Sequence, residues 1–105
     1  MREAEIEKIL VKEVKTLGGV AYKWVSPGND GVPDRIVIFP GKKPIFVELK
    51  TNHGKLSALQ KVQCKRLLDL GQRVEILYGL QEVAMFFDLE GFGESAEKIR
   101  RKMGQ

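Results

Sequence analysis

The chain has 105 residues, of which 43% are hydrophobic and 30% charged, and it carries a formal net charge of +4. This length suits one compact domain, and the composition excludes a disordered or fibrous protein. No apolar run reaches the roughly 18 residues of a membrane span, no signal peptide is expected, and the positive surplus permits but does not require contact with phosphates.

The first half of the chain predicts one helix and three strands. Apolar side chains at helical spacing indicate a helix over residues 3–17, which Gly18-Gly19 ends. Three runs rich in β-branched and aromatic residues then predict strands over residues 20–25, 35–39 and 45–50. Turn-rich loops at 26–33 and 40–44 connect these strands.

The second half predicts two helices around a fourth strand. Ser57 and Gln60 form the capping-box pattern at the start of a helix that runs to about residue 70. The residues expected to point inward from this helix are Leu59, Val62, Leu67 and Leu70. A strand over 73–78 and a short helix over 80–87 follow, and the polar, basic tail over 93–105 is expected to be a frayed helix.

This order of elements predicts an α/β fold, with a mixed sheet of about four strands flanked by helices in the order α-β-β-β-α-β-α. We expect one domain over residues 1–105, with its core formed by about residues 3–88. The single cysteine, Cys64, is expected near the core of a helix. It excludes an internal disulfide and a cysteine-rich zinc site, which fits a reducing cytoplasm.

Three charged residues interrupt the predicted strands. Asp34 directly precedes the strand at 35–39, and Glu48 and Lys50 lie within the strand at 45–50. Because side chains alternate along a strand, Glu48 and Lys50 share one face, with stems roughly 6.6 Å apart. In a central strand each unpaired buried charge would cost several kcal/mol, and two facing carboxylates repel unless a cation lies between them.

These residues have the chemistry of a metal site. Asp34 and Glu48 offer hard oxygen ligands that suit Mg²⁺ or Mn²⁺ better than zinc, and the Leu49 carbonyl is a further candidate ligand. Lys50 can hold an attacking water or neutralise a phosphate, so the parts needed for phosphodiester hydrolysis are present. The alternative is an edge strand whose Glu48 and Lys50 face water. The position of Asp34, at the matching end of the neighbouring strand, favours the interpretation as an active site.

The motifs resemble those of a known nuclease family. Pro33-Asp34 followed by Glu48-Leu49-Lys50 is similar to the signature of the PD-(D/E)XK nucleases, and the wider context resembles the VRR-Nuc family within that superfamily. The matching residues are Lys23–Gly28, Gly31–Arg35, Phe46–Lys50, Leu56, Ser57 and Gln60. The resemblance covers about residues 3–88.

The resemblance implies a restriction-endonuclease-like core and a divalent-metal nuclease, with Asp34 and Glu48 as ligands and Lys50 orienting or activating water. It implies that Gln60 points at the active site, although the capping box alone explains this residue. Stand-alone phage and bacterial members imply a homodimer acting on branched DNA such as four-way (Holliday) junctions. The compartment expected is the cytoplasm of a bacterium or phage-infected host.

The family also implies a glutamate from the first helix near the metal. A helical wheel places Glu3 and Glu13 within the face expected to be buried and Glu7 at its margin. Glu3 heads a Glu-x-x-Ile pattern like that of relatives, so it is our choice, with Glu7 second. The alternative is that all three are solvated helix carboxylates.

Five residues are candidate DNA contacts, and each has a simpler explanation. They are Lys23, Ser26, Asn29, Arg35 and His53. Turn chemistry accounts equally well for Ser26 and Asn29, and the three basic residues could be solvated charges. Tyr22 and Trp24 could stack on a base, but aromatic residues in an apolar strand more often belong to a core.

Two other functions remain open from the sequence. A DNA-binding module of this fold would not cleave, but it has no reason to keep the costly charges of Asp34, Glu48 and Lys50. A sequence-specific restriction-type nuclease would need an element that reads bases in a major groove, for which 105 residues leave little room. If the chain forms a homodimer, Phe86, Phe87 and Phe92 are candidate interface residues, with completion of the core as the alternative.

Overall fold

The structure of the chain is a computed structural model that describes residues 1–104. Its elements are, in chain order, α1 (Glu3–Thr16), β1 (Val20–Lys23), β2 (Arg35–Ile38), β3 (Ile45–Lys50), α2 (Ala58–Asp69), β4 (Val74–Tyr78), α3 (Gly79–Leu89) and α4 (Gly93–Met103). None of the helices in residues 1–104 has the length and apolar character needed to cross a membrane.

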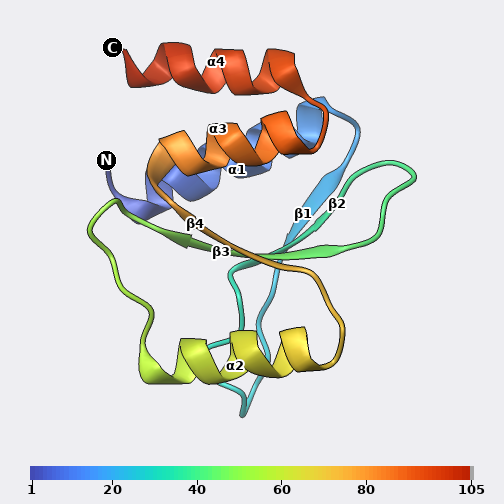
Figure 1. Cartoon of the computed structure of the whole chain (residues 1–105), viewed down its shortest axis with the longest axis vertical. Coiled ribbons are helices and arrows are strands. Elements are labelled where there is room, and N and C mark those ends of the chain that lie inside the picture. Colours follow the sequence, from blue (N-terminus) through green and yellow to red (C-terminus); the bar gives the residue numbers. More distant parts are fainter. Residues whose placement is uncertain (105) are drawn as a thin grey trace.

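The four strands form one mixed sheet in the order β1-β2-β3-β4. β1 pairs with β2 and β2 with β3 in antiparallel fashion, whereas β3 and β4 are parallel. Parallel neighbours need a crossover connection, which α2 supplies. Figure 1 shows α1, α3 and α4 stacked on one side of the sheet and α2 alone on the other. The predicted α/β fold with a mixed, four-stranded sheet is therefore confirmed.

The main core lies between the sheet and α1, α3 and α4. Val47 and Leu49, on one face of β3, are fully buried there. The Phe39 ring collects three aromatic neighbours from the C-terminal part of the chain, with centroid distances of 6.0 Å to Phe86, 6.1 Å to Phe87 and 4.8 Å to Phe92. Phe86 and Phe87 are buried and Phe92 is half-buried against them, so the structure supports the alternative that these residues complete the core.

The basic tail is a packed helix rather than a frayed one. Ser95, Ala96 and Ile99 of α4 are buried, and the last two belong to the main core cluster. Ile99 lies three positions after Ala96 and four after Ser95, so the three residues share one narrow face that the surrounding charged residues conceal in the sequence. The core therefore extends well past residue 88, contrary to expectation.

The orientation of α2 differs from the expected one. Leu59, Val62 and Leu70 were expected to point inward, but their exposed fractions are 55%, 50% and 68%. The stripe that turns toward the sheet instead contains Gln60, Gln63, Cys64 and Leu67. Leu67 therefore points inward as expected. Gln60 lies on this stripe because it faces the charged side chain of Glu48 in β3.

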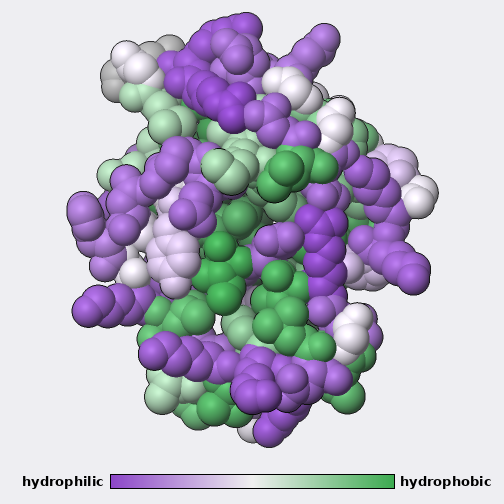
Figure 2. Space-filling model, viewed as in Figure 1, coloured by the Kyte–Doolittle hydropathy of each residue, from purple (hydrophilic) through white to green (hydrophobic). Residues whose placement is uncertain are grey.

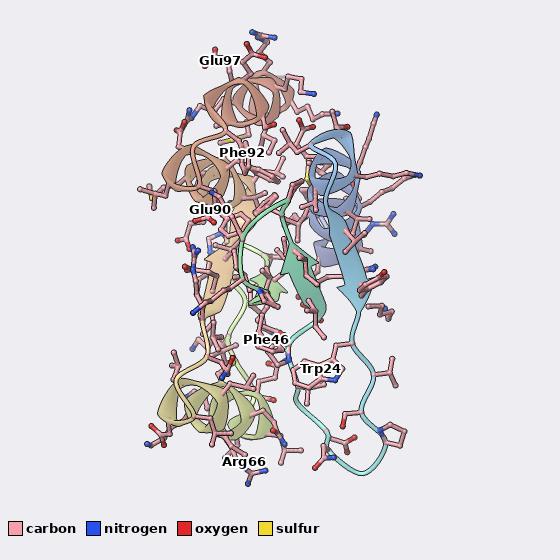
Figure 3. All side chains as sticks on the ribbon, turned by 90° about the vertical axis from the view of Figure 1, so that its right-hand side faces the viewer. Trp24, Phe46, Arg66, Glu90, Phe92 and Glu97 are labelled. Atoms are coloured by element: carbon pink, nitrogen blue, oxygen red, sulfur yellow. The ribbon has the colours of Figure 1, made fainter. Side chains whose placement is uncertain are left out.

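β1 ends at Lys23, two residues earlier than expected, but Trp24 still packs on the sheet. Its ring centroid lies 5.2 Å from that of Phe46, and Figure 3 shows the two side chains close together on the side of the sheet where α2 lies. Tyr22 is mostly exposed on the edge strand. Trp24 is thus a packing residue, on the same face of the sheet as Glu48 and Lys50.

Candidate active site

Asp34 lies at the end of the loop that enters β2. Its backbone carbonyl accepts a hydrogen bond from the Trp24 N–H at 3.1 Å, which continues the ladder between β1 and β2 by one residue. Its side-chain Oδ2 accepts a hydrogen bond from the Leu49 N–H at 2.9 Å. This bond fixes the Asp34 carboxylate against the backbone of β3, directly beside Glu48.

Glu48 is a buried carboxylate in the middle of the sheet, with an exposed fraction of 1%. Its Oε2 accepts a hydrogen bond from Gln60 Nε2 at 2.9 Å and lies 3.5 Å from Lys50 Nζ. Its other oxygen, Oε1, is buried and has no hydrogen-bond partner within residues 1–104. An unsatisfied buried carboxylate oxygen is costly, so a positively charged ligand at this position would relieve a real penalty.

Gln60 serves two purposes at once. Its backbone N–H donates to Ser57 Oγ at 3.1 Å and its side-chain Oε1 accepts from the Ser57 N–H at 2.9 Å, which completes the capping box. Its Nε2 is then directed at Glu48. The capping and functional interpretations of the sequence are therefore compatible, because they use different atoms of the same amide.

The surroundings of Asp34 and Glu48 disfavour a negative charge on both carboxylates at once. Burial, followed by the charge of Asp34, raises the pKa of Glu48 to about 7, although Lys50 opposes the change. Burial also raises the pKa of Asp34, against the opposing effect of the Leu49 N–H bond. Two carboxylates held close in a partly dehydrated site are the arrangement that a divalent cation stabilises.

The residues present fit a hard divalent cation. The donors are carboxylate oxygens, and one of them is unpaired and buried. No group of three or more Asp, Glu, His or Cys side chains in the described chain gathers as a ready ligand set. That suits Mg²⁺, which binds through one or two carboxylates and keeps several waters. A role for the Leu49 carbonyl stays a prediction.

The structure separates the three glutamates of α1. Glu13 lies away from the site, where its Oε1 is 2.8 Å from Lys98 Nζ of α4 in an ion pair without hydrogen-bond geometry. Glu7 is near Asp34, whose pKa it helps to raise, but its Oε2 is bound to Arg35 Nε at 2.7 Å. Glu3 is half-buried and close enough to Glu48 to add a smaller increase to the pKa of that carboxyl.

The predicted DNA contacts fall into two groups. Arg35 is half-buried and engaged inside the protein, since it donates to Glu7 and, at 3.0 Å, to the Ala21 carbonyl. Asn29 Nδ2 donates to Ser26 Oγ at 3.0 Å, which is ordinary turn chemistry. Lys23 and His53 are exposed, and Lys23 is near enough to lower the pKa of Asp34 against the dominant effect of burial. Contact with DNA stays a prediction for all five.

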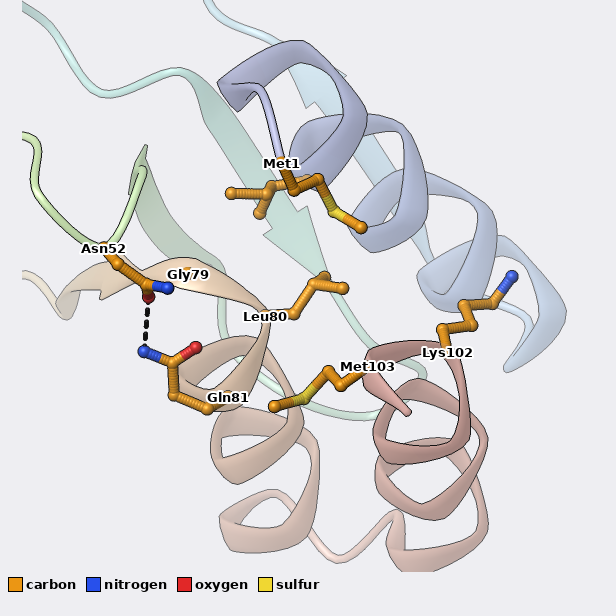
Figure 4. Close-up of a pocket in the computed structure, with 8 residues that line it drawn as sticks. Met1, Asn52, Gly79, Leu80, Gln81, Lys102 and Met103 are labelled. Carbon is orange, nitrogen blue, oxygen red and sulfur yellow. Dashed lines mark hydrogen bonds between the residues drawn. The ribbon is translucent and has the colours of Figure 1, made fainter. Parts of the chain in front are cut away.

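Sequence reasoning missed the support of the loop that follows Lys50. A Cβ added to Gly54 would lie 3.3 Å from Cβ and Cδ of Lys50, so this loop packs against the lysine stem. The same loop is tied to α3, where Gln81 Nε2 donates to Asn52 Oδ1 beside Gly79, at the rim of a pocket of about 270 Å³ (Figure 4). Only the glycine spacing could have indicated these contacts.

The chain is similar in sequence to one known protein and in fold to another. No protein-family model matches the chain. A protein named "Putative nuclease p44" from Acyrthosiphon pisum secondary endosymbiont phage 1 is 51% identical over 77 residues, which cover 73% of this chain and 83% of that protein. A solved VRR_NUC domain has a TM-score of 0.67 at 24% identity, covers 94% of each chain and supports the fold. The chain therefore belongs to the same family as this putative phage nuclease and has the fold of a VRR_NUC domain.

Proposed function

We propose that the protein is a divalent-metal-dependent endodeoxyribonuclease that uses Mg²⁺ or Mn²⁺. The observation that carries this proposal is the buried, unpaired Oε1 of Glu48 beside the Asp34 carboxylate. A non-cleaving DNA-binding module would gain nothing from the two raised carboxyl pKa values. The name of the phage relative supports the same activity.

Each residue of the site has a distinct task in this proposal. Asp34 and Glu48 would hold the metal, which supplies Lewis-acid chemistry at a phosphodiester. Lys50, whose Nζ lies 3.5 Å from Glu48 Oε2, orients a water or balances the charge of the phosphate. Gln60 orients Glu48, and Glu3 is the residue of α1 best placed to hold a water at the rim of the site.

The proposed substrate is branched DNA, such as a four-way junction. The described residues form one sheet with its covering helices, which leaves little room among them for a separate element that reads bases in a major groove. In a homodimer, two active sites related by a twofold axis would also suit the cleavage of two opposed DNA strands of a junction. A sequence-specific restriction-type nuclease remains the competing enzyme.

Removal of the metal is expected to abolish cleavage. With Mg²⁺ or Mn²⁺ the wild-type protein should cut a labelled four-way junction in preference to a linear duplex of the same sequence, and excess EDTA should reduce the rate to background. The measurement is product formation on denaturing gels. Binding of the junction without cutting under either metal would instead favour the DNA-binding module, and equal cutting of a single short sequence in both substrates would favour the restriction-type enzyme.

We also propose a homodimer formed through the outer face of α2. Leu59, Val62 and Leu70 are all at least half exposed, and they lie along one side of this helix or just after it. Figure 2 shows apolar surface gathered in the lower half of the molecule, where α2 lies, between polar side chains. Contiguous exposed apolar surface on a folded domain usually marks an interaction site, and the second copy is the partner we propose.

Charge placed on this face is expected to separate the subunits. Val62→Lys should give a monomer in analytical ultracentrifugation at a concentration where the wild type is dimeric, because an unpaired ammonium in an interface core costs about 2 kcal/mol or more. Met85→Lys is the matched control, since Met85 on α3 is 55% exposed against 50% for Val62. A monomeric wild type, or equal effects of the two substitutions, would contradict this interface.

A further inference from the structure

Gly31 makes an unusually close contact with the first turn of α2. It lies in the loop between β1 and β2 with φ of +92°. A Cβ added here would lie 2.5 Å from the backbone carbon of Leu59, 2.6 Å from its oxygen and 2.8 Å from the Gln60 nitrogen. Backbone atoms cannot rotate out of the way as a side chain can. Only glycine therefore allows the loop and the helix to approach this closely.

This contact joins the supports of both proposed metal ligands. On the helix side, Gln60 directly follows Leu59 and donates the hydrogen bond to Glu48. On the loop side, the chain runs from Gly31 through buried Pro33 to Asp34, which is fixed on the Leu49 N–H. A displacement at this contact would therefore change the position of one carboxylate relative to the other.

Little else attaches α2 to the rest of the protein. Cys64 is its one buried residue, with an exposed fraction of 4%. The rest of its inward stripe is half-buried, and its apolar face points outward. Because burial of apolar side chains contributes little here, the position of the first turn of α2 depends on a few contacts, which include the Gln60–Glu48 hydrogen bond and the contact at Gly31.

We propose that Gly31 is a positioning residue that seats the first turn of α2 and so sets the spacing of the Asp34 and Glu48 carboxylates. It acts through Gln60 and touches neither the metal nor the substrate. The inference rests on the proposed function, because the quantity that it controls is the geometry of the proposed metal site.

Gly28 provides a matched control within the same loop. It has φ of +81°, and an added Cβ would meet nothing within 4 Å. Gly31→Ala and Gly28→Ala therefore share the conformational cost of a positive φ in a residue with a side chain. Only Gly31→Ala also pushes against α2, so the difference between the two variants isolates the contact.

Two readouts that do not depend on cleavage test the proposal. Alkylation of Cys64 in the metal-free protein reports whether α2 lifts from the sheet, and calorimetric titration with Mn²⁺ reports the metal site. Gly31→Ala should label several-fold faster than the wild type and bind Mn²⁺ about tenfold more weakly, as for loss of a residue that orients a ligand. Gly28→Ala should match the wild type in both, and circular dichroism checks that each variant folds.

A third variant separates the two steps. Gln60→Ala should weaken Mn²⁺ binding but leave Cys64 better protected than it is in Gly31→Ala. The substitution removes the hydrogen bond to Glu48 and one capping bond, but it keeps the bond from the backbone N–H of residue 60 to Ser57 Oγ and the close contact at Gly31. The proposal is overturned if Gly31→Ala behaves like Gly28→Ala, or if it exposes Cys64 without weakening Mn²⁺ binding.

The wild-type protein provides a test that does not depend on the folding of Gly31→Ala. A nuclear Overhauser effect between the Gly31 Hα atoms and the Gln60 amide proton is expected in solution, and its absence from an assigned spectrum would overturn the proposal. Failure of the proposed function is a different result. A wild type that binds Mn²⁺ but cuts no DNA would contradict the nuclease while leaving the role of Gly31 supported.

Discussion

Replacement of Glu48 by glutamine is expected to abolish DNA cleavage and, at the same time, to stabilise the metal-free protein. The substitution keeps the shape of the side chain and still offers an oxygen to Gln60 Nε2. It removes a proposed metal ligand, so the cleavage rate should fall by about a thousandfold or more. It also removes a buried charge that faces Asp34, so the free energy of unfolding in EDTA should rise by about 2 kcal/mol at neutral pH.

Glu13→Gln is the matched control for this result. Glu13 is the other buried glutamate of the described chain, but it pairs with Lys98 far from the site. Its replacement should leave cleavage unchanged and lower the free energy of unfolding by about 1 kcal/mol, because Lys98 loses its partner. Junction cleavage and urea unfolding measure the two effects. Residual cleavage by Glu48→Gln near the wild-type rate would show that the site lies elsewhere.

Bound Mn²⁺ is expected to stabilise the protein much more at about pH 8 than at about pH 5.5, since metal binding needs the deprotonated carboxylates. Burial and the charge of Asp34 raise the pKa of Glu48 from 4.5 to about 7 in the folded protein. Between these values the folded state binds a proton that the unfolded state has lost. The stability of the metal-free protein should therefore fall as the pH rises from about 4.5 to 7, by at most about 3 kcal/mol.

The raised pKa of Asp34 acts in the same direction. A cation that takes the place of the proton should restore the lost stability, so the melting curves with Mn²⁺ and with EDTA should diverge progressively through this pH range. Thermal unfolding at a series of pH values measures the divergence. The metal-free Glu48→Gln protein should show a much weaker pH dependence. An increase in melting temperature that is equal at both ends of the range would contradict the assignment of Glu48 as a ligand.

The part of the site that lies on the sheet was predictable from the sequence. Alternation along β3 places Glu48 and Lys50 on one face whatever the tertiary structure, and the short connection at residues 40–44 favours the antiparallel pairing of β2 and β3. Asp34 at the start of β2 must then lie near the end of β3. The structure adds the bond between Asp34 and the Leu49 N–H, which no local pattern specifies.

The helices were harder to place because their environment is set by distant residues. Periodicity identifies a face of α2 but not the direction in which it points. The apolar face was expected inward, whereas the buried charge of Glu48 requires the polar face bearing Gln60 there. Arg35 illustrates the same limit, because its role depends on Glu7, 28 positions away in the chain. The contact between Gly31 and Leu59 is likewise a property of the folded chain alone.

The polar inner stripe of α2 has a consequence for how this fold can evolve or be redesigned. Leucine at position 60 alone would leave the buried Glu48 carboxylate without its amide partner, whereas apolar residues at both positions would bury more apolar surface and remove the charge. Selection for stability alone would therefore favour the loss of Gln60 and Glu48 together. A redesign scored only on folding would erase this site first, since its residues are those that the fold least needs.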